Sequence, residues 1–145
     1  MSGTIVVGVD GSPQSERALT WAVDEATVHG DDLLLVHAWA YPGILTISYG
    51  GPTLPVFTRD DIEKLSHDLL ERAADQARRR APGLVVTTRL EQGHPGAALV
   101  EAARGARMLV VGSRGLGGFK GLLLGSVSTS CVHHATCPIV IIPPG

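Results

Sequence analysis

Residues 108–126 read MLVVGSRGLGGFKGLLLGS, in which a short apolar run leads into a glycine-rich segment. The run 108–111 is typical of a buried strand, and a helix is expected over 126–135. Six of the fifteen residues 112–126 are glycine. Glycine lets backbone N–H groups approach an anion without a Cβ atom in the way. A helix start adds unpaired N–H groups and the positive end of its dipole, and Ser126, Ser128 and Thr129 add hydroxyls. The segment therefore predicts a phosphate-binding loop between a strand and a helix.

A tight turn that holds no ligand would account for one or two of these glycines. Six are costly in conformational entropy unless a ligand compensates for them, so phosphate binding is the favoured interpretation. No Gly-Lys-Ser/Thr closes the loop, which excludes a Walker-type phosphate loop. The spacing of Gly112 and Gly115, and the position after the fourth expected strand, do not fit the dinucleotide fingerprint either.

The rest of the chain alternates β-branched runs with helical patterns, which predicts an α/β fold with a parallel sheet. Residues 4–10 are apolar on both faces, as a central parallel strand is. The other expected strands are 33–39, 84–90, 108–111 and 138–143, and the expected helices are 13–29, 59–81, 95–103 and 126–135. The sequence contains no internal repeat and no linker, so residues 1–145 are expected to form a single domain.

Capping residues mark the ends of the expected helices. Ser12, which precedes a proline, predicts the start of the first helix, and Gly30 predicts its end. Thr58 and Asp61 resemble a capping box and predict the start of the second helix. The buried side of that helix is expected to carry Ile62, Leu65, Leu69, Ala73 and Ala77. Residues 41–57 are rich in Gly and Pro and form either a lid over a site or a plain crossover.

Composition excludes several classes of protein. Of the 145 residues 44% are hydrophobic and 18% charged, which is neither a disordered nor a membrane composition. No apolar run is long enough to span a bilayer and no basic secretory segment opens the chain, so a cytoplasmic location without a membrane partner is expected. The net charge is −2 and 4% of residues are aromatic, which disfavours nucleic acid as a partner. The basic run 78–80 is interpreted as a solvated helix end.

The segment 131–137, CVHHATC, raises the question of a zinc site. A structural zinc site usually needs a fourth ligand at matching spacing, often a paired C-x-x-C, so no metal is expected here. Cys131 is expected to pack on a helix, and Cys137 to be buried where the last strand begins. His37 is interpreted as a satisfied core histidine and His94 as a helix cap.

Gly112-x-x-Gly115, followed after nine residues by Gly125-Ser126, resembles the G-2x-G-9x-G-S/T motif of ATP-binding universal stress proteins. The segments VGVDGS (7–12), LVHA (35–38) and HATCPIV (134–140) also resemble that family, so the likeness covers essentially the whole chain. It implies a five-stranded parallel sheet of order 3-2-1-4-5 with helices on both faces, the adenine nucleotide alpha-hydrolase-like fold. In that order the chain reverses between the first and fourth strands, where ligands bind beyond the carboxyl ends.

The resemblance also implies an ATP site in which Mg²⁺ or Mn²⁺ accompanies the phosphates. The backbone of Ala38 would read the adenine edge, and the Asp10 carboxylate would lie near the ribose or the phosphates. The nucleoside pocket would be lined by Gly8, Val9 and Asp10. The loop around ribose and phosphates would comprise Gly112, Ser113, Arg114, Gly115, Leu116, Gly117 and Gly118, and the phosphate tail would be held by Gly125, Ser126, Val127 and Ser128. Asp10 has an alternative role as a carboxylate that accepts hydrogen bonds from the amides of Gly11 or Ser12.

Three functions remain open. The favoured one is an ATP-binding regulator of the stress response, in which nucleotide occupancy changes a surface that a partner reads. A slow ATPase or self-phosphorylating enzyme is the alternative: Arg114 and Lys120 could hold phosphates, but no motif supplies a base, so no catalytic residue is assigned. The third is a structural dimer module with an empty loop. The resemblance implies a homodimer through strand 138–143, whose apolar residues would otherwise form a bare sheet edge.

Overall fold

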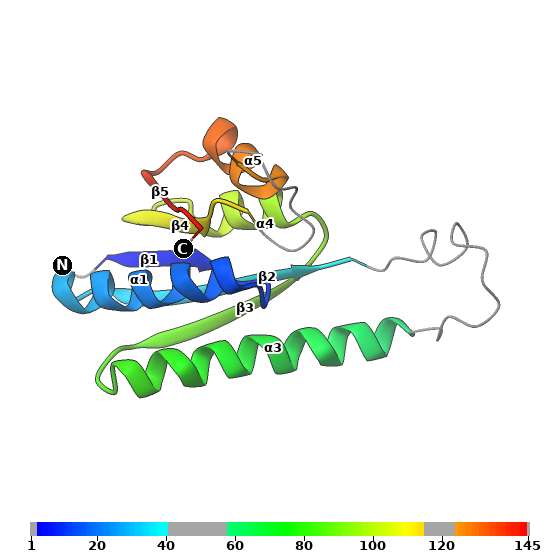
Figure 1. Ribbon diagram of the computed structural model, residues 1–145, viewed down its shortest axis with the longest axis horizontal. Helices are drawn as coiled ribbons and strands as arrows, with labels where there is room; N and C mark the ends of the chain where they lie inside the picture. Colours follow the sequence, from blue (N-terminus) through cyan, green and yellow to red (C-terminus); the bar gives the residue numbers. More distant parts are fainter. Residues whose placement is uncertain (1–2, 41–57, 115–123, 145) are drawn as a thin grey trace.

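A computed structural model describes residues 3–40, 58–114 and 124–144. Its elements in chain order are β1 (Thr4–Gly8), α1 (Pro13–His29), β2 (Asp32–Trp39), α3 (Arg59–Arg80), β3 (Val86–Gln92), α4 (Pro95–Ala102), β4 (Met108–Gly112), α5 (Ser126–His134) and β5 (Ile139–Ile142). The five strands form one parallel sheet of order β3-β2-β1-β4-β5 (Figure 1). The expected α/β fold and strand order are therefore confirmed.

Helices cover both faces of the sheet, which gives the protein two cores. Side chains of α1 and α3 pack on one face, together with Ile5 and Val7 of β1. Side chains of α4 and α5 pack on the other, together with Val6 (Figure 1). All three β1 side chains have no exposed surface. Consecutive strand residues point to opposite faces, so β1 belongs to both cores at once.

The helix caps formed as the sequence predicts. The Ser12 hydroxyl accepts a hydrogen bond from the Ser15 amide at 3.2 Å, and Gly30 closes α1 with a left-handed φ of 69°. Thr58 and Asp61 make both bonds of the capping box at the start of α3. His94 caps α4.

Two strands, β1 and β3, differ from the sequence prediction by two residues, and the other three agree with it to within one residue at each end. β3 runs from Val86 to Gln92 because Leu84 lies in the turn after α3, where its amide donates to the Ala81 carbonyl at 3.0 Å. β1 ends at Gly8 because Asp10 already belongs to the turn that leads into α1.

The expected buried side of α3 is partly wrong. Its buried residues are Ser66, Leu70, Ala74 and Ala77, whereas Leu65 is 55% exposed. Leu69 and Ala73 are partly buried against the same core, so the buried stripe is turned by about one residue from the predicted one. α3 is the longest helix, with 22 residues, and it is rich in charge. No helix in the described parts of the chain is both long and apolar enough to cross a membrane.

A buried carboxylate ties three segments together at the amino edge of the sheet. The Asp31 side chain has no exposed surface, accepts from the Gly3 amide at 2.7 Å and forms an ion pair with Arg107. The Arg107 amide in turn donates to the Thr4 carbonyl at 2.8 Å. The Arg107 guanidinium, with help from the Gly3 amide, holds the pKa of the Asp31 carboxyl below its usual value. Asp31 therefore fastens the start of β1 to the turns before β2 and β4.

This ion pair predicts an acid-sensitive contribution to stability. Since the pKa of Asp31 is lowered in the folded protein, its contribution is complete above the ordinary carboxyl pKa of about 3.9 and is lost as the pH falls through the folded value. We expect Asp31→Asn to lower the melting temperature at pH 7, because Arg107 loses its partner, and this difference from wild type to shrink as the pH is lowered towards 3. Asp68→Asn, an exposed position on α3, is the control and should melt as wild type does. An Asp31→Asn difference that stays constant from pH 7 to pH 3 would contradict the assignment.

Candidate functional site

The candidate site lies where β1 and β4 end, at the point where the strand order reverses. Val7 of β1 lies beside Val110 of β4, so the next residues of both strands emerge together at the carboxyl edge. From there the chain enters α1 on one face and α5 on the other (Figure 1). In open parallel sheets, ligands bind beyond the strands at such a reversal.

Hydrogen bonds from β2 hold the β1 side of the site in place. The Val9 amide donates to the Val36 carbonyl at 3.0 Å, and the Val9 carbonyl lies 2.7 Å from Nδ1 of His37. His37 is thus a satisfied histidine, as the sequence predicts. This contact joins β2 to the residue after β1, so it could not be predicted from the sequence around His37.

The turn after Val9 is fixed by a small polar network. The Asp10 carboxylate accepts from the Ser12 amide at 2.9 Å, and the Asp10 amide donates to the Ser15 hydroxyl at 3.3 Å. Ser12 and Ser15 are 2% and 6% exposed. Asp10 therefore has the local role that the sequence left open, as the acceptor of a helix N-terminal amide. This bond orients the carboxylate at the edge of the site.

The β4 side of the site contains a buried hydroxyl without a partner. The Ser113 amide donates to the Ile142 carbonyl at 2.9 Å, and the Ser113 carbonyl accepts from the Gly125 amide at 2.6 Å and the Ser128 hydroxyl at 2.9 Å. Ser113 is 3% exposed, yet its own hydroxyl has no hydrogen-bond partner. It is the one buried side-chain nitrogen or oxygen in residues 3–40, 58–114 and 124–144 of which this holds. A buried hydroxyl without a partner is unusual and suggests that a ligand or water completes it.

The amino end of α5 adds further donors. Its N-cap is Gly125, which has no side chain that could accept the first amides of the helix. These amides and the positive end of the helix dipole favour an anion. The Ser128 hydroxyl is directed to the carbonyls of Ser113 and Gly125, at 2.9 and 3.1 Å. Its hydrogen is therefore engaged, so a contact from Ser128 to a ligand would come from its amide.

Two glycines of the expected site lie close to a neighbouring helix. A Cβ atom on Gly8 would lie 2.9 Å from Cδ1 of Leu99 in α4. A Cβ atom on Gly112 would lie 2.9 Å from Cβ of Gln14 and 3.2 Å from its carbonyl oxygen. Gly112 is therefore required by the close approach of α1, whatever the loop binds.

The expected site residues fall into two groups. The structure places one group around the carboxyl ends of β1, β2 and β4 and the amino end of α5: Gly8, Val9, Asp10, Ala38, Gly112, Ser113, Arg114, Gly125, Ser126, Val127 and Ser128. The others, Gly115, Leu116, Gly117 and Gly118, lie outside the described residues. Sequence reasoning treated Ser113 as a loop residue only and missed its buried hydroxyl, because that burial depends on β5 and α5.

A cavity of about 430 Å³ adjoins the β1 side of the site. It lies on the face covered by α1 and α3, between Asp10 and Ser15 on one side and Leu69 and Arg72 of α3 on the other. Asp10 therefore borders this cavity as well as the end of β1.

The described residues give no sign of a zinc centre. Cys131 is buried in α5 and Cys137 is half-buried before β5, so the expectation of a fully buried Cys137 is wrong. Burial raises the pKa of the Cys131 thiol to about 11, which disfavours the thiolate form that binds metals. Across the described ranges, no three His, Cys, Asp or Glu side chains are grouped so that they could hold a metal ion.

The comparisons with known proteins agree on one family. Residues 1–143 match the family described as "Universal stress protein family". A universal stress protein of Mycolicibacterium smegmatis is 39% identical over 140 residues, which cover 97% of this chain and 45% of that protein. Universal stress protein Rv2005c of Mycobacterium tuberculosis is 37% identical over 137 residues, which cover 94% of this chain and 44% of that protein. The chain thus spans about half the length of these two relatives.

Solved structures share the fold over nearly the whole chain. A universal stress protein crystallised in complex with cAMP has a TM-score of 0.68 and 30% identity, with 97% of this chain and 95% of that one covered.

The packing of Gly112 yields a testable consequence. We expect Gly112→Ala to lower the free energy of unfolding by about 1–3 kcal/mol, because the added methyl group meets the backbone of α1, which cannot rotate away. Gly83→Ala is the matched control, since a Cβ atom there would meet nothing within 4 Å. Urea unfolding of both variants without nucleotide measures the difference. Equal stability of the two variants would show that α1 does not require a glycine at 112.

Proposed function

We propose that this chain, which belongs to the universal stress protein family, binds an adenine nucleotide where β1, β4 and α5 meet, and that it acts as a nucleotide-dependent regulator in the stress response. The observation that carries the proposal is the unpartnered, buried hydroxyl of Ser113 beside the uncapped amino end of α5. Both features supply hydrogen-bond donors at one place, and phosphate oxygens are strong acceptors.

The nucleotide we propose is ATP, accompanied by Mg²⁺ or Mn²⁺. Its phosphates would lie against residues 112–118 and the first turn of α5, and its adenine would meet the backbone of Ala38 at the end of β2. The Asp10 carboxylate, oriented by the Ser12 amide, would face the ribose or the metal-bound phosphates. The cAMP complex of a 30% identical relative supports an adenine nucleotide as the ligand class.

A single backbone amide tests whether the phosphates lie at α5. Gly125 has φ −76° and ψ 175°, a conformation that permits a following proline, and proline suits the first position of a helix. Ser126 is exposed, so Ser126→Pro should fold while it removes one N–H group from the proposed phosphate site. A hydrogen bond to a charged group contributes about 1.5–3 kcal/mol, so we expect ATP affinity to fall about 10- to 100-fold in calorimetric titration.

Ser126→Ala is the matched control, because it removes the hydroxyl and keeps the amide. It should lose clearly less affinity than Ser126→Pro, and adenosine, which has no phosphates, should bind the two variants equally. Nucleotide released from the denatured wild-type protein is identified first, and GTP serves as the competitor. If wild type does not bind adenine nucleotides, the function is wrong; if Ser126→Pro binds ATP as tightly as Ser126→Ala, the phosphates lie elsewhere.

We also propose a homodimer through β5. This strand is an edge of the sheet, and Ile139, Val140 and Ile141 are only half-buried in the single chain. An apolar sheet edge with unpaired backbone groups favours pairing with another strand.

The dimer is tested by its mass in solution. Light scattering at micromolar concentration should return twice the chain mass of 15.2 kDa, and dilution should lower it towards that of one chain. A mass of one chain at every concentration would contradict the dimer and leave the nucleotide site untouched.

A further inference from the structure

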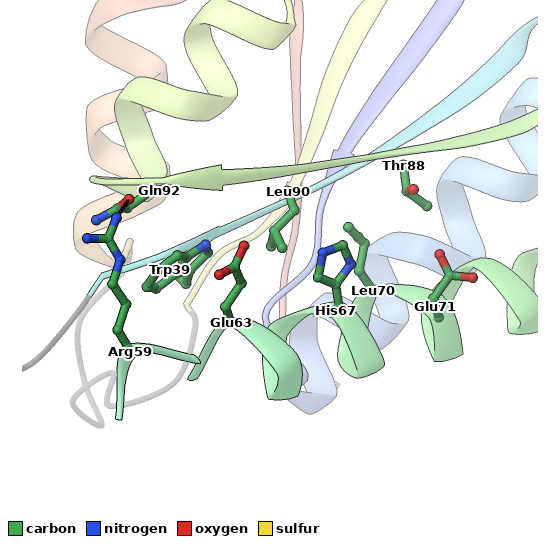
Figure 2. Close-up of a pocket in the computed structure, with 9 residues that line it drawn as sticks. All are labelled: Trp39, Arg59, Glu63, His67, Leu70, Glu71, Thr88, Leu90 and Gln92. Carbon is green, nitrogen blue, oxygen red and sulfur yellow. Dashed lines mark hydrogen bonds between the residues drawn. The ribbon is translucent and has the colours of Figure 1, made fainter. Parts of the chain in front are cut away.

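A groove of about 440 Å³ runs between α3 and the carboxyl ends of β2 and β3 (Figure 2). It lies on the opposite face of β2 from the proposed adenine contact, because Trp39 lines the groove and its neighbour Ala38 points to the other face. A volume of this size accommodates a small molecule.

The face of α3 that borders this groove is polar, although the sheet opposite it presents the apolar side chains of Trp39 and Leu90. Arg59, Glu63, His67 and Glu71 recur every four residues and so share one face of α3. Figure 2 shows Glu63 and His67 opposite Trp39 and Leu90 of the sheet, and Glu71 opposite Thr88. A helix face that packs on a sheet is ordinarily apolar, as the second half of α3 is with its buried alanines. The polar face therefore borders a space that a ligand can fill.

One end of the groove offers donors to an anion. Trp39 is 7% exposed, and Figure 2 draws its indole nitrogen at the end of the ring nearer Glu63, on the side away from Arg59. The Arg59 guanidinium lies 5.8 Å from the centre of the Trp39 ring and donates to Oε1 of Gln92 at 2.6 Å. These two contacts fix the guanidinium over the indole ring, where it can donate to a carboxylate.

Further along the groove, two carboxylates face the same space. Glu63 and Glu71 take part in no ion pair within the described ranges. They lie two helical turns apart, about 12 Å along the helix axis, with Leu70 and Leu90 between the helix and the sheet. Together with Arg59 they give the groove one guanidinium and two carboxylates, and His67 lies between the two carboxylates (Figure 2).

We propose that this groove binds a free basic α-amino acid such as lysine or arginine. That class of molecule carries one carboxylate and two cations, the exact complement of the groove. Its carboxylate accepts from Arg59, its α-ammonium pairs with Glu63, and its aliphatic chain passes Leu90 so that the terminal cation reaches Glu71. The assignment does not depend on nucleotide binding, since the groove shares no residue with that site.

Calorimetric titration of the full chain with four small molecules tests the assignment. L-lysine or L-arginine should bind. L-norleucine, which lacks the terminal ammonium, and cadaverine, which lacks the carboxylate, should each bind at least about tenfold more weakly. If neither basic amino acid binds at about 10 mM, or if norleucine binds as well as lysine, the proposal is wrong.

Three variants separate the two ends of the groove. Glu71→Gln should weaken lysine about tenfold and leave norleucine unchanged, whereas Arg59→Gln, which removes the guanidinium, should weaken both and leave cadaverine bound no more weakly than in wild type. Asp68→Asn lies on α3 outside the groove and should bind lysine as wild type does. Melting temperatures of all three establish that they fold. Lysine binding that is equal in Glu71→Gln and wild type would overturn the charge assignment.

Discussion

Burial of β1 on both faces is the constraint on which the rest of the structure depends. Ile5, Val6 and Val7 are fully buried, and hydrogen-bonded neighbours flank the strand on both sides. A strand in this position needs helices on both faces, and the chain leads from β1 into α1 on one face and from β4 into α5 on the other. The end of β1 therefore lies beside the end of β4 with one helix start on each side. The candidate site is a consequence of this arrangement, and its donors come mainly from backbone.

Glycine has two separate roles around this site. Gly112 is required because Cβ and the backbone of Gln14 in α1 leave no room for a Cβ atom, whereas a Cβ atom at Gly8 would displace the end of the Leu99 side chain in α4. Gly125 has an ordinary extended conformation and matters because it leaves the amino end of α5 without a side-chain cap. A count of glycines in the sequence cannot separate these roles, since the residues that make Gly112 necessary lie about a hundred positions away.

Much of the fold could be predicted from local signals, and the errors have a common cause. Caps such as Ser12 and the box at Thr58 depend on neighbours in sequence, so they formed as expected. The buried face of α3 depends on how the helix is rotated against the sheet, which buries Ser66 and Leu70 and leaves Leu65 exposed. The strand order came from the resemblance to a family, because periodicity alone does not order strands. The unpartnered Ser113 hydroxyl and the bond from His37 to Val9 require tertiary contacts and could not be read locally.

The carboxyl end of β2 separates two regions of different chemistry. Ala38 and Trp39 are adjacent, so they point to opposite faces of the sheet, one towards the proposed nucleotide and one towards the groove under α3. The nucleotide region relies on amides and hydroxyls, which suit phosphate, whereas the groove relies on charged side chains of one helix. The β2 backbone between them is held on both sides, since His37 contacts the Val9 carbonyl and the Trp39 carbonyl accepts from the Gly93 amide at 2.8 Å. Coupling between two sites requires an element that can adopt two arrangements. The end of β2, fixed by these hydrogen bonds, has a single arrangement. The two regions are therefore expected to bind independently, and a substitution in one leaves the other as a control.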